Sequence, residues 1–171
     1  MRLQGNNTFL RALEPHDVEC LFHWENDPSN WLVSGTKTPF SKQQISQYIK
    51  GIRDIYIDKQ LRLMICTEQE PIGTIDLYDF NPANMRAGIG ILIGKEKYRG
   101  KGYAKDALQT LIKYAFEILI LHQLHVCIPA YNVKSQELFE KNGFVQSGTR
   151  TEWLKTKDGW EDEFIYQLLR S

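Results

Sequence analysis

Several short apolar-rich segments of the chain, bounded by turn residues, have the pattern that is typical of β-strands, and residues 8–13 alternate. These segments comprise residues 8–13, 61–67, 72–80, 87–93, 124–128, 144–147, 149–155 and 160–169. Asp158-Gly159, a strong short-range signal for a β-hairpin, comes just before the last segment. We therefore expect the chain to end in a pair of antiparallel strands.

Helical periodicity is clearest from residue 103 to about residue 119, where apolar residues recur at three- and four-residue spacing. Lys105 and Asp106 belong to the polar face of this helix. Weaker patterns predict helices over residues 15–26 and 132–141, and Asn132 is well placed to cap the second of them.

A capping box predicts one more helix in the first third of the chain. Ser41 is followed three residues later by Gln44, and isoleucines extend the apolar stripe as far as Ile55. The preceding residues, 27–40, are weakly patterned and are expected to form an irregular loop. Strands and helices thus succeed one another without a repeat or a linker. This order predicts a single mixed α/β (α+β) domain over residues 1–171, with helices on a mostly antiparallel sheet of about seven strands.

The composition narrows the range of partners. The 21 Lys and Arg residues are balanced by 21 Asp and Glu residues, so we expect neither nucleic acid nor a membrane as a partner. The three cysteines lack C-x-x-C spacing and the four histidines lack metal-ligand spacing, so neither a disulfide framework nor a metal site is expected. The first residues lack the apolar run of a signal peptide, and the cytoplasm is the expected location.

The segment Arg99-Gly100-Lys101-Gly102-Tyr103-Ala104 follows an apolar strand and opens the longest helix. Unpaired backbone N–H groups at a helix N-terminus favour a phosphate, and glycines let phosphate oxygens approach the backbone. Lysines and an arginine surround the glycines, at positions 95, 97, 99, 101 and 105. The alternative is an ordinary flexible turn with a solvated, charged face. Neither a Walker A motif nor a G-x-G-x-x-G dinucleotide fingerprint is present.

Two motifs in this order resemble those of the GNAT acetyltransferase superfamily. The segment of residues 99–104 is similar to its R/Q-x-x-G-x-G/A motif. Asn132-Val133-Lys134-Ser135, followed by Leu138-Phe139-Glu140-Lys141-Asn142-Gly143-Phe144, resembles its N-x-x-S/A…Y/F-x-x-x-G-F segment. The expected layout of strands and helices also matches over nearly the whole chain. Within the superfamily, the chain resembles the branch of spermidine N-acetyltransferases and ribosomal-protein N-terminal acetyltransferases.

The resemblance implies an acetyl-CoA-dependent N-acetyltransferase whose sheet splays at a central parallel pair of strands. The pantetheine arm of acetyl-CoA, the co-substrate, would then pair with the backbone of Ile91, Leu92 and Ile93. The pyrophosphate would be held by Arg99, Gly100, Lys101, Gly102, Tyr103 and Ala104. Asn132 and Ser135 would complete the cofactor site. A plain helix cap is the alternative role for Asn132, and both roles can hold at once.

Proton transfer is where the chain departs from the family pattern. Gly88 stands where polyamine-acetylating relatives have a glutamate, which leaves Asp79 as the candidate base, ahead of Asp76. The alternative for Asp79 is a solvent-facing carboxylate at a strand end. Phe139 stands where many relatives have the tyrosine that protonates the thiolate. Substitutes for that acid are Tyr131, Tyr78 and Tyr103, unless these aromatic residues only pack.

The acceptor is expected to be a primary amine, on a protein N-terminus, a polyamine or another small molecule. Its recognition is assigned to residues 25–40, with tryptophans walling the entrance: Trp24, Trp31, Trp153 and Trp160. Nearby carboxylates form a possible acidic patch: Asp17, Glu19, Glu25 and Asp27. A homodimer is possible. The competing hypothesis is a catalytically weak acetyl-CoA-binding regulatory module.

Overall fold

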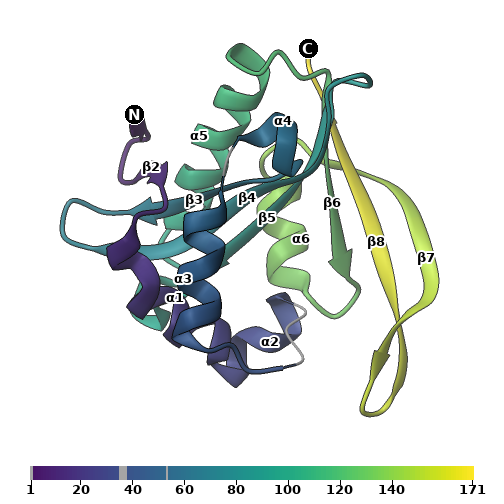
Figure 1. Cartoon of the computed structure of the whole chain (residues 1–171). Helices are drawn as coiled ribbons and strands as arrows, with labels where there is room; N and C mark the ends of the chain where they lie inside the picture. Colours follow the sequence, from purple (N-terminus) through teal and green to yellow (C-terminus); the bar gives the residue numbers. More distant parts are fainter. Residues whose placement is uncertain (1, 35–37, 53) are drawn as a thin grey trace.

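A computed structural model describes residues 2–34, 38–52 and 54–171 (Figure 1). One sheet of eight strands, in the order β1-β2-β3-β4-β5-β6-β8-β7, runs through the molecule. The strands are β1 Arg2–Gln4, β2 Phe9–Ala12, β3 Leu61–Cys66, β4 Pro71–Asn81, β5 Arg86–Ile93, β6 Gln123–Pro129, β7 Val145–Thr156 and β8 Gly159–Leu169. All neighbouring strands are antiparallel except β5 and β6, which are parallel. The predicted mixed, mostly antiparallel sheet is confirmed.

The helices form two layers, one on each face of the sheet (Figure 1). They are η1 Pro15–Asp17, α1 Val18–Asn26, α2 Pro28–Ser34, α3 Lys42–Gly51, α4 Ile55–Asp58, η2 Glu96–Tyr98, α5 Tyr103–Glu117 and α6 Val133–Glu140. α5 buries Leu108 and Leu111 against one face of the sheet, in the larger apolar core. Leu21 of α1 and Ile45 of α3 form a smaller core with Met64 on the other face.

Several boundaries differ from the sequence-based expectation. β1 was missed, because three residues are too few to show alternation. Residues 144–147 and 149–155 largely form one bulged strand, β7, and not two. A helix, α2, occupies part of the segment that was expected to be irregular. The helix predicted over residues 41–55 ends at Gly51, and Asp54 then caps the separate α4 through the backbone N–H of Tyr56 at 2.8 Å.

Asp106 does not lie on the solvated face of α5, where the helical pattern placed it. Its carboxylate is buried and accepts hydrogen bonds from the backbone N–H groups of Asn6, Asn7 and Thr8 at 2.8–2.9 Å. The Thr8 hydroxyl donates a fourth, at 2.7 Å. Asp106 therefore joins the N-terminal residues to the first turn of the helix that the glycine-rich loop opens.

Candidate active site

The parallel strands β5 and β6 pair over only part of their length. The last register pair joins Gly88 to His125, and none follows within the described residues. β5 nevertheless continues to Ile93, paired with β4 on its other side, and β6 continues to Pro129. The two strands therefore splay beyond Gly88. This leaves the β6-facing edge of residues 89–93 open for an extended ligand to pair with.

The loop before α5 has the backbone shape of an anion site. Gly100 has a φ of 71°, and Gly102, the N-cap of α5, has a φ of 85°, values that favour glycine. A Cβ added to either residue meets no other atom within 4 Å, so packing is not the reason for glycine. The first N–H groups of α5 point into this open space. The arrangement fits a pyrophosphate group.

Glu70 neutralises part of the positive charge around this loop. Its carboxylate forms ion pairs with Lys95 and with Lys97, the second at 2.6 Å, and accepts a hydrogen bond from the Tyr98 hydroxyl at 2.9 Å. Hydrogen bonds from Lys95, Lys97 and Tyr98 lower the pKa of Glu70 to about 2. The sequence did not reveal Glu70 as the partner of these lysines, because the turn that carries it is distant along the chain.

Arg99 holds the loop in place through its guanidinium. Nε donates to the Ile93 carbonyl at 2.9 Å, and a terminal nitrogen donates to Oδ1 of Asn30 at 2.7 Å. The buried Asn30 donates in turn to the Trp24 carbonyl at 3.0 Å. Exposed Lys101 and Lys105 are the remaining cations that lie near the glycines.

Asn132 is the N-cap of α6, where its Oδ1 accepts a hydrogen bond from the Ser135 backbone N–H at 3.2 Å. This contact confirms the capping role that the sequence predicts. The cap uses only the carbonyl oxygen of the side chain. The amide N–H₂ group of Asn132 is therefore not committed by the cap, and a role of Asn132 in holding the pantetheine arm stays a prediction.

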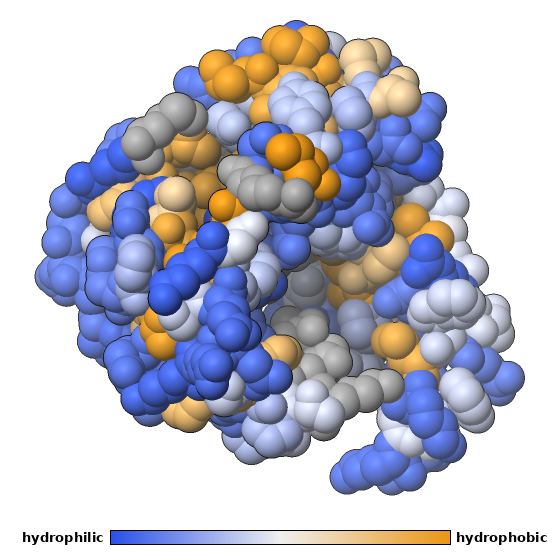
Figure 2. Space-filling model, in the orientation of Figure 1, coloured by the Kyte–Doolittle hydropathy of each residue, from blue (hydrophilic) through white to orange (hydrophobic). Residues whose placement is uncertain are grey.

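A cavity of about 470 Å³ lies on the sheet where β4, β5, β6 and β8 meet, lined by Asp79, Asn81, Arg86, Gln123, His125, Ile165 and Gln167. Burial lowers the pKa of His125, so its ring is neutral at pH 7. The negative charge of Asp79 and the positive charge of Arg86 then cancel, so the lining has no net charge. Figure 2 shows the front of the molecule hollowed between its helical side and the β7–β8 hairpin.

Residues 7–145 match the family model of the acetyltransferase (GNAT) domain. The chain belongs to the GNAT acetyltransferase family. This GNAT chain is 29% identical over 166 residues to a putative ribosomal N-acetyltransferase of Bacillus subtilis, covering 94% of this chain and 90% of that protein. It is 28% identical over 165 residues to a spermidine N(1)-acetyltransferase of Vibrio cholerae, with 95% and 92% covered.

Solved structures show the same GNAT fold. A probable acetyltransferase superimposes with a TM-score of 0.85 at 28% identity, covering 99% of this chain and 97% of that one. The spermidine N-acetyltransferase of Vibrio cholerae in complex with CoA and spermine superimposes with a TM-score of 0.86 at 24% identity, covering 95% of each chain. The protein is thus an N-acetyltransferase, and its acetyl donor is acetyl-CoA.

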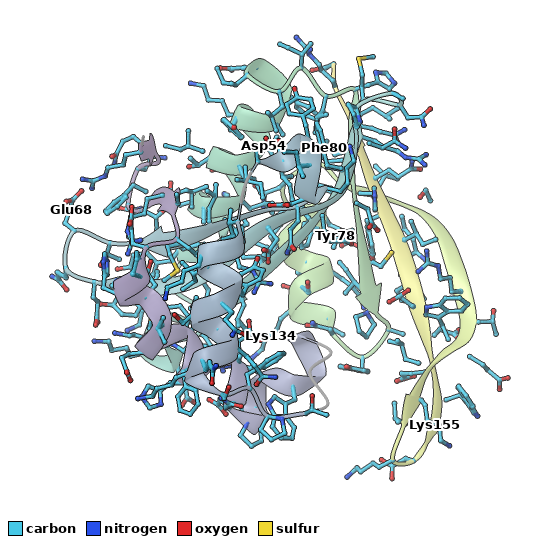
Figure 3. All side chains as sticks on the ribbon, viewed as in Figure 1. Asp54, Glu68, Tyr78, Phe80, Lys134 and Lys155 are labelled. Carbon is cyan, nitrogen blue, oxygen red and sulfur yellow. The ribbon has the colours of Figure 1, made fainter. Side chains whose placement is uncertain are left out.

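An aromatic ring covers Gly88, the position at which the resemblance places a glutamate in polyamine-acetylating relatives. Tyr78 lies opposite Gly88 in the register of β4 and β5, and a Cβ added to Gly88 would lie 2.3 Å from Cε2 of the Tyr78 ring. The same ring meets His125 edge-on, with 5.8 Å between the centroids. Figure 3 shows Tyr78 beside β6, near the point where the parallel strands separate. Any larger residue at position 88 would therefore clash with the Tyr78 ring.

Phe139, which replaces the usual tyrosine, belongs to the core. It is 1% exposed and packs edge-on against Phe144, with 5.0 Å between the ring centroids. Phe139 has no ionisable proton, so it cannot protonate a leaving thiolate.

Asp79 and Asp76, the two carboxylates weighed as bases, lie in different surroundings. Asp79 is exposed, has a φ of 48° and lies within a register irregularity of β4, at the cavity. Asp76 is buried opposite Gly90, and its Oδ1 accepts from Nε of Arg62 at 2.6 Å. Asp76 is thus committed to a guanidinium. The sequence contained a signal for this pair, since charges opposite each other in a predicted hairpin attract.

The four carboxylates of the possible acidic patch each have a partner of their own. Asp17 is buried against Arg11 at 2.7 Å, and Glu19 pairs with Lys42 at 2.8 Å. Glu25 pairs with Arg62 at 3.2 Å. The fourth member, Asp27, accepts a hydrogen bond from the backbone N–H of Ser29 at 2.9 Å.

Trp24 was expected at the entrance of the site and is instead buried. It is 5% exposed and packs against Gly94, where a Cβ would lie 2.3 Å from the indole. Trp31 donates its indole N–H to the Glu25 carbonyl at 3.0 Å. Trp153 and Trp160 are more than half exposed on the β7–β8 hairpin. Only these two therefore keep the exposed position that an entrance requires.

Proposed function

We propose that the enzyme transfers the acetyl group of acetyl-CoA directly to a primary amine, and that its preferred acceptor is the α-amino group of a peptide or protein. Pantetheine binds along the open edge of β5, at Ile91, Leu92 and Ile93. The backbone of residues 99–104 binds the pyrophosphate, with Asn132 and Ser135 on the opposite strand-to-helix junction. The splay of β5 from β6 directly ahead of this loop is the observation that carries the donor assignment.

The cavity at the paired ends of β5 and β6, lined by Arg86, Gln123 and His125 among others, supports an α-amine acceptor. Its lining has one carboxylate, one guanidinium, three side-chain amides and a neutral histidine. Such a lining offers hydrogen bonds to peptide groups, but no net negative field for a polycation. An α-amine also needs less help to lose its proton. At pH 7 roughly one α-amine in six to eleven is neutral, against about one lysine-like amine in 2,500.

We propose Asp79 as the group that receives the proton of the acceptor. It is the carboxylate in the cavity lining. Its charge opposes the lowering of the His125 pKa by burial and adds to the rise that burial causes in the Tyr78 pKa. A solvent-exposed carboxylate is a weak base, which suffices for an amine whose pKa is already near 8.

A polyamine is the second candidate acceptor, favoured by a different recess. A cavity of about 240 Å³ is lined by Tyr48, Gly51, Ile52, Asp58, Gln60 and Arg62. Arg62 forms ion pairs with Glu25 and Asp76, and Asp58 is a further carboxylate in the lining of the recess. This recess has the charge that an alkyl diammonium requires, on the same sheet face as Gly90. The spermidine N-acetyltransferases among the relatives give this candidate further support.

A matched panel of acceptors tests these alternatives. Thiol release from acetyl-CoA is measured with N-terminal peptides that differ in their first residues, with the same peptides already N-acetylated, and with polyamines. We expect release with free peptides and none with acetylated ones. Higher kcat/KM for polyamines would replace the first candidate by the second. Tight acetyl-CoA binding without release for any amine would overturn the proposed function and favour a binding module.

Self-association is proposed as well, because one solved structure of the Vibrio cholerae spermidine N-acetyltransferase, 26% identical with a TM-score of 0.79, is dodecameric. Light scattering would measure the mass in solution.

We further propose that the enzyme acts in the cytoplasm. None of the described helices is long and apolar enough to cross a membrane.

A further inference from the structure

The ring of Tyr78 lies over the last register pair of the parallel strands. Cζ, the ring atom that carries the hydroxyl, would lie 2.4 Å from a Cβ added to Gly88, and the ring meets His125 edge-on. Gly88 and His125 are the last pair, and the strands separate beyond them. The hydroxyl therefore borders the start of the splay.

The thioester end of the proposed donor, acetyl-CoA, would also lie near the start of the splay. Pantetheine that pairs with the open edge of β5 from Ile93 back to Ile91 brings its thioester next to Gly90. Gly90 is two residues beyond Gly88, the β5 member of the last pair, over which the Tyr78 ring lies. Gly90 has no side chain, so nothing of that residue stands between the thioester and the Tyr78 hydroxyl.

The ring has little freedom to leave this position. Gly88 lies beneath it so closely that a single added methyl group would overlap the ring. The His125 ring stands at 89° to it on the β6 side. A hydroxyl held by contacts on two strands is a positioned group, as acid catalysis requires.

Surrounding groups keep the phenol protonated. Burial raises the pKa of Tyr78 to about 12, and the negative charges of Asp79 and Glu163 add to the rise. The phenol therefore carries its O–H proton at neutral pH. Arg150, the nearest described cation on β7, is committed to Glu163 at 2.7 Å.

We propose that Tyr78, on β4, is the general acid that protonates the leaving thiolate of coenzyme A, in place of the tyrosine that Phe139 replaces on α6. This assignment rests on the proposed acetyl transfer. The amine lone pair attacks the thioester carbon, and the carbonyl π pair moves to oxygen. On collapse, the C–S bond breaks with its electron pair on sulfur, and the Tyr78 O–H proton moves to that sulfur. The proton lost by the acceptor nitrogen returns through solvent to the phenolate.

The variant Tyr78→Phe keeps the ring on Gly88 and removes only the proton. We expect kcat to fall about 10²-fold or more while the KM for acetyl-CoA stays within about twofold, since a positioned acid acts in the transition state. Tyr56→Phe, an exposed tyrosine of α4, is the matched control and should leave kcat unchanged. Tyr131→Phe tests the competing tyrosine next to Asn132.

A binding measurement examines the same hydroxyl without turnover. Calorimetry compares CoA with desulfo-CoA, which lacks the sulfur atom. The wild type should bind CoA about tenfold more tightly, because a hydroxyl faces the sulfur, and Tyr78→Phe should lose this preference while binding acetyl-CoA equally well. A purely structural tyrosine would weaken all three ligands together.

The outcomes separate the two proposals. If Tyr78→Phe keeps the wild-type kcat and the preference for CoA over desulfo-CoA, Tyr78 is not the general acid, although the proposed acetyl transfer stands. The same holds if kcat falls only in Tyr131→Phe. An enzyme that acetylates no amine would remove the proposed function. The CoA against desulfo-CoA comparison would still show whether Tyr78 faces the sulfur.

Discussion

The proposed donor half and the proposed acceptor half of the site differ in what they offer a ligand. The donor half offers backbone: an open strand edge, two glycines with positive φ and the first N–H groups of α5. The acceptor half offers side chains from several strands, among them Asp79, His125 and Gln167. A backbone site recognises one constant ligand, whereas a side-chain site can change its acceptor by substitution. This division explains why the donor is shared by a family whose acceptors differ.

The largest effect that separates the halves is expected from Gly102→Val. Valine rarely adopts a φ of 85°, and its side chain would fill the space left for phosphate oxygens. Loss of one or two charge-assisted hydrogen bonds, at about 1.5–3 kcal/mol each, weakens acetyl-CoA binding about 10- to 10⁴-fold. Calorimetry measures the affinity, and Gly51→Ala, at the exposed end of α3, is the control. Normal affinity in Gly102→Val would place the pyrophosphate elsewhere.

The same contrast explains what the sequence predicts and what it does not. Gly100, Gly102 and Asn132 act through the backbone near them, so residue type and spacing along the chain are enough to find them. Tyr78, Gly88 and His125 meet because of the register of three strands, which alternation alone does not set. Trp24 and Asp106 look like surface residues in their own helices. Their partners, Gly94 and the N-terminal residues, are distant along the chain.

The second-largest effect is expected from Asp106, whose hydrogen bonds fix the first turn of α5 in the proposed donor half. Asp106→Asn removes a carboxylate that accepts four hydrogen bonds, so we expect the free energy of unfolding at pH 7 to fall by about 2–4 kcal/mol. Burial pushes the pKa of Asp106 up, but bonds from Thr8, Asn7 and Asn6 outweigh it and the pKa is lowered. This stabilisation is present above the unfolded value near 3.9 and is lost as the pH falls through the folded pKa.

Urea unfolding at pH 7 and pH 3 measures this effect. The wild type and Asp106→Asn should differ most at pH 7 and approach each other at pH 3. Glu117→Gln, an exposed residue at the other end of α5, should match the wild type at both values. If the difference in unfolding free energy between the wild type and Asp106→Asn is as large at pH 3 as at pH 7, the stabilisation comes from packing and not from the carboxylate charge.

Asp79→Asn tests the acceptor half, with a smaller expected loss. Removal of the proposed base should lower kcat by about 10²-fold at pH 7, because general bases contribute at least that factor. Acetyl-CoA affinity should stay unchanged, since the residue lies outside the donor half. Raising the pH neutralises more of the acceptor amine and should restore part of the rate. Asp158→Asn on the exposed hairpin turn serves as the control, and equal rates for both variants would leave Asp79 a surface carboxylate.

The smallest effect should come from Lys101, the exposed cation between the two glycines. If backbone N–H groups supply most of the binding, Lys101→Gln removes only a screened surface attraction of about 0.5–1 kcal/mol. Acetyl-CoA affinity then falls about two- to fivefold, and the difference disappears as salt is raised. A loss as large as that of Gly102→Val would mean that side-chain charge, and not backbone geometry, holds the pyrophosphate. The donor half would then resemble the acceptor half, and the division between them would not stand.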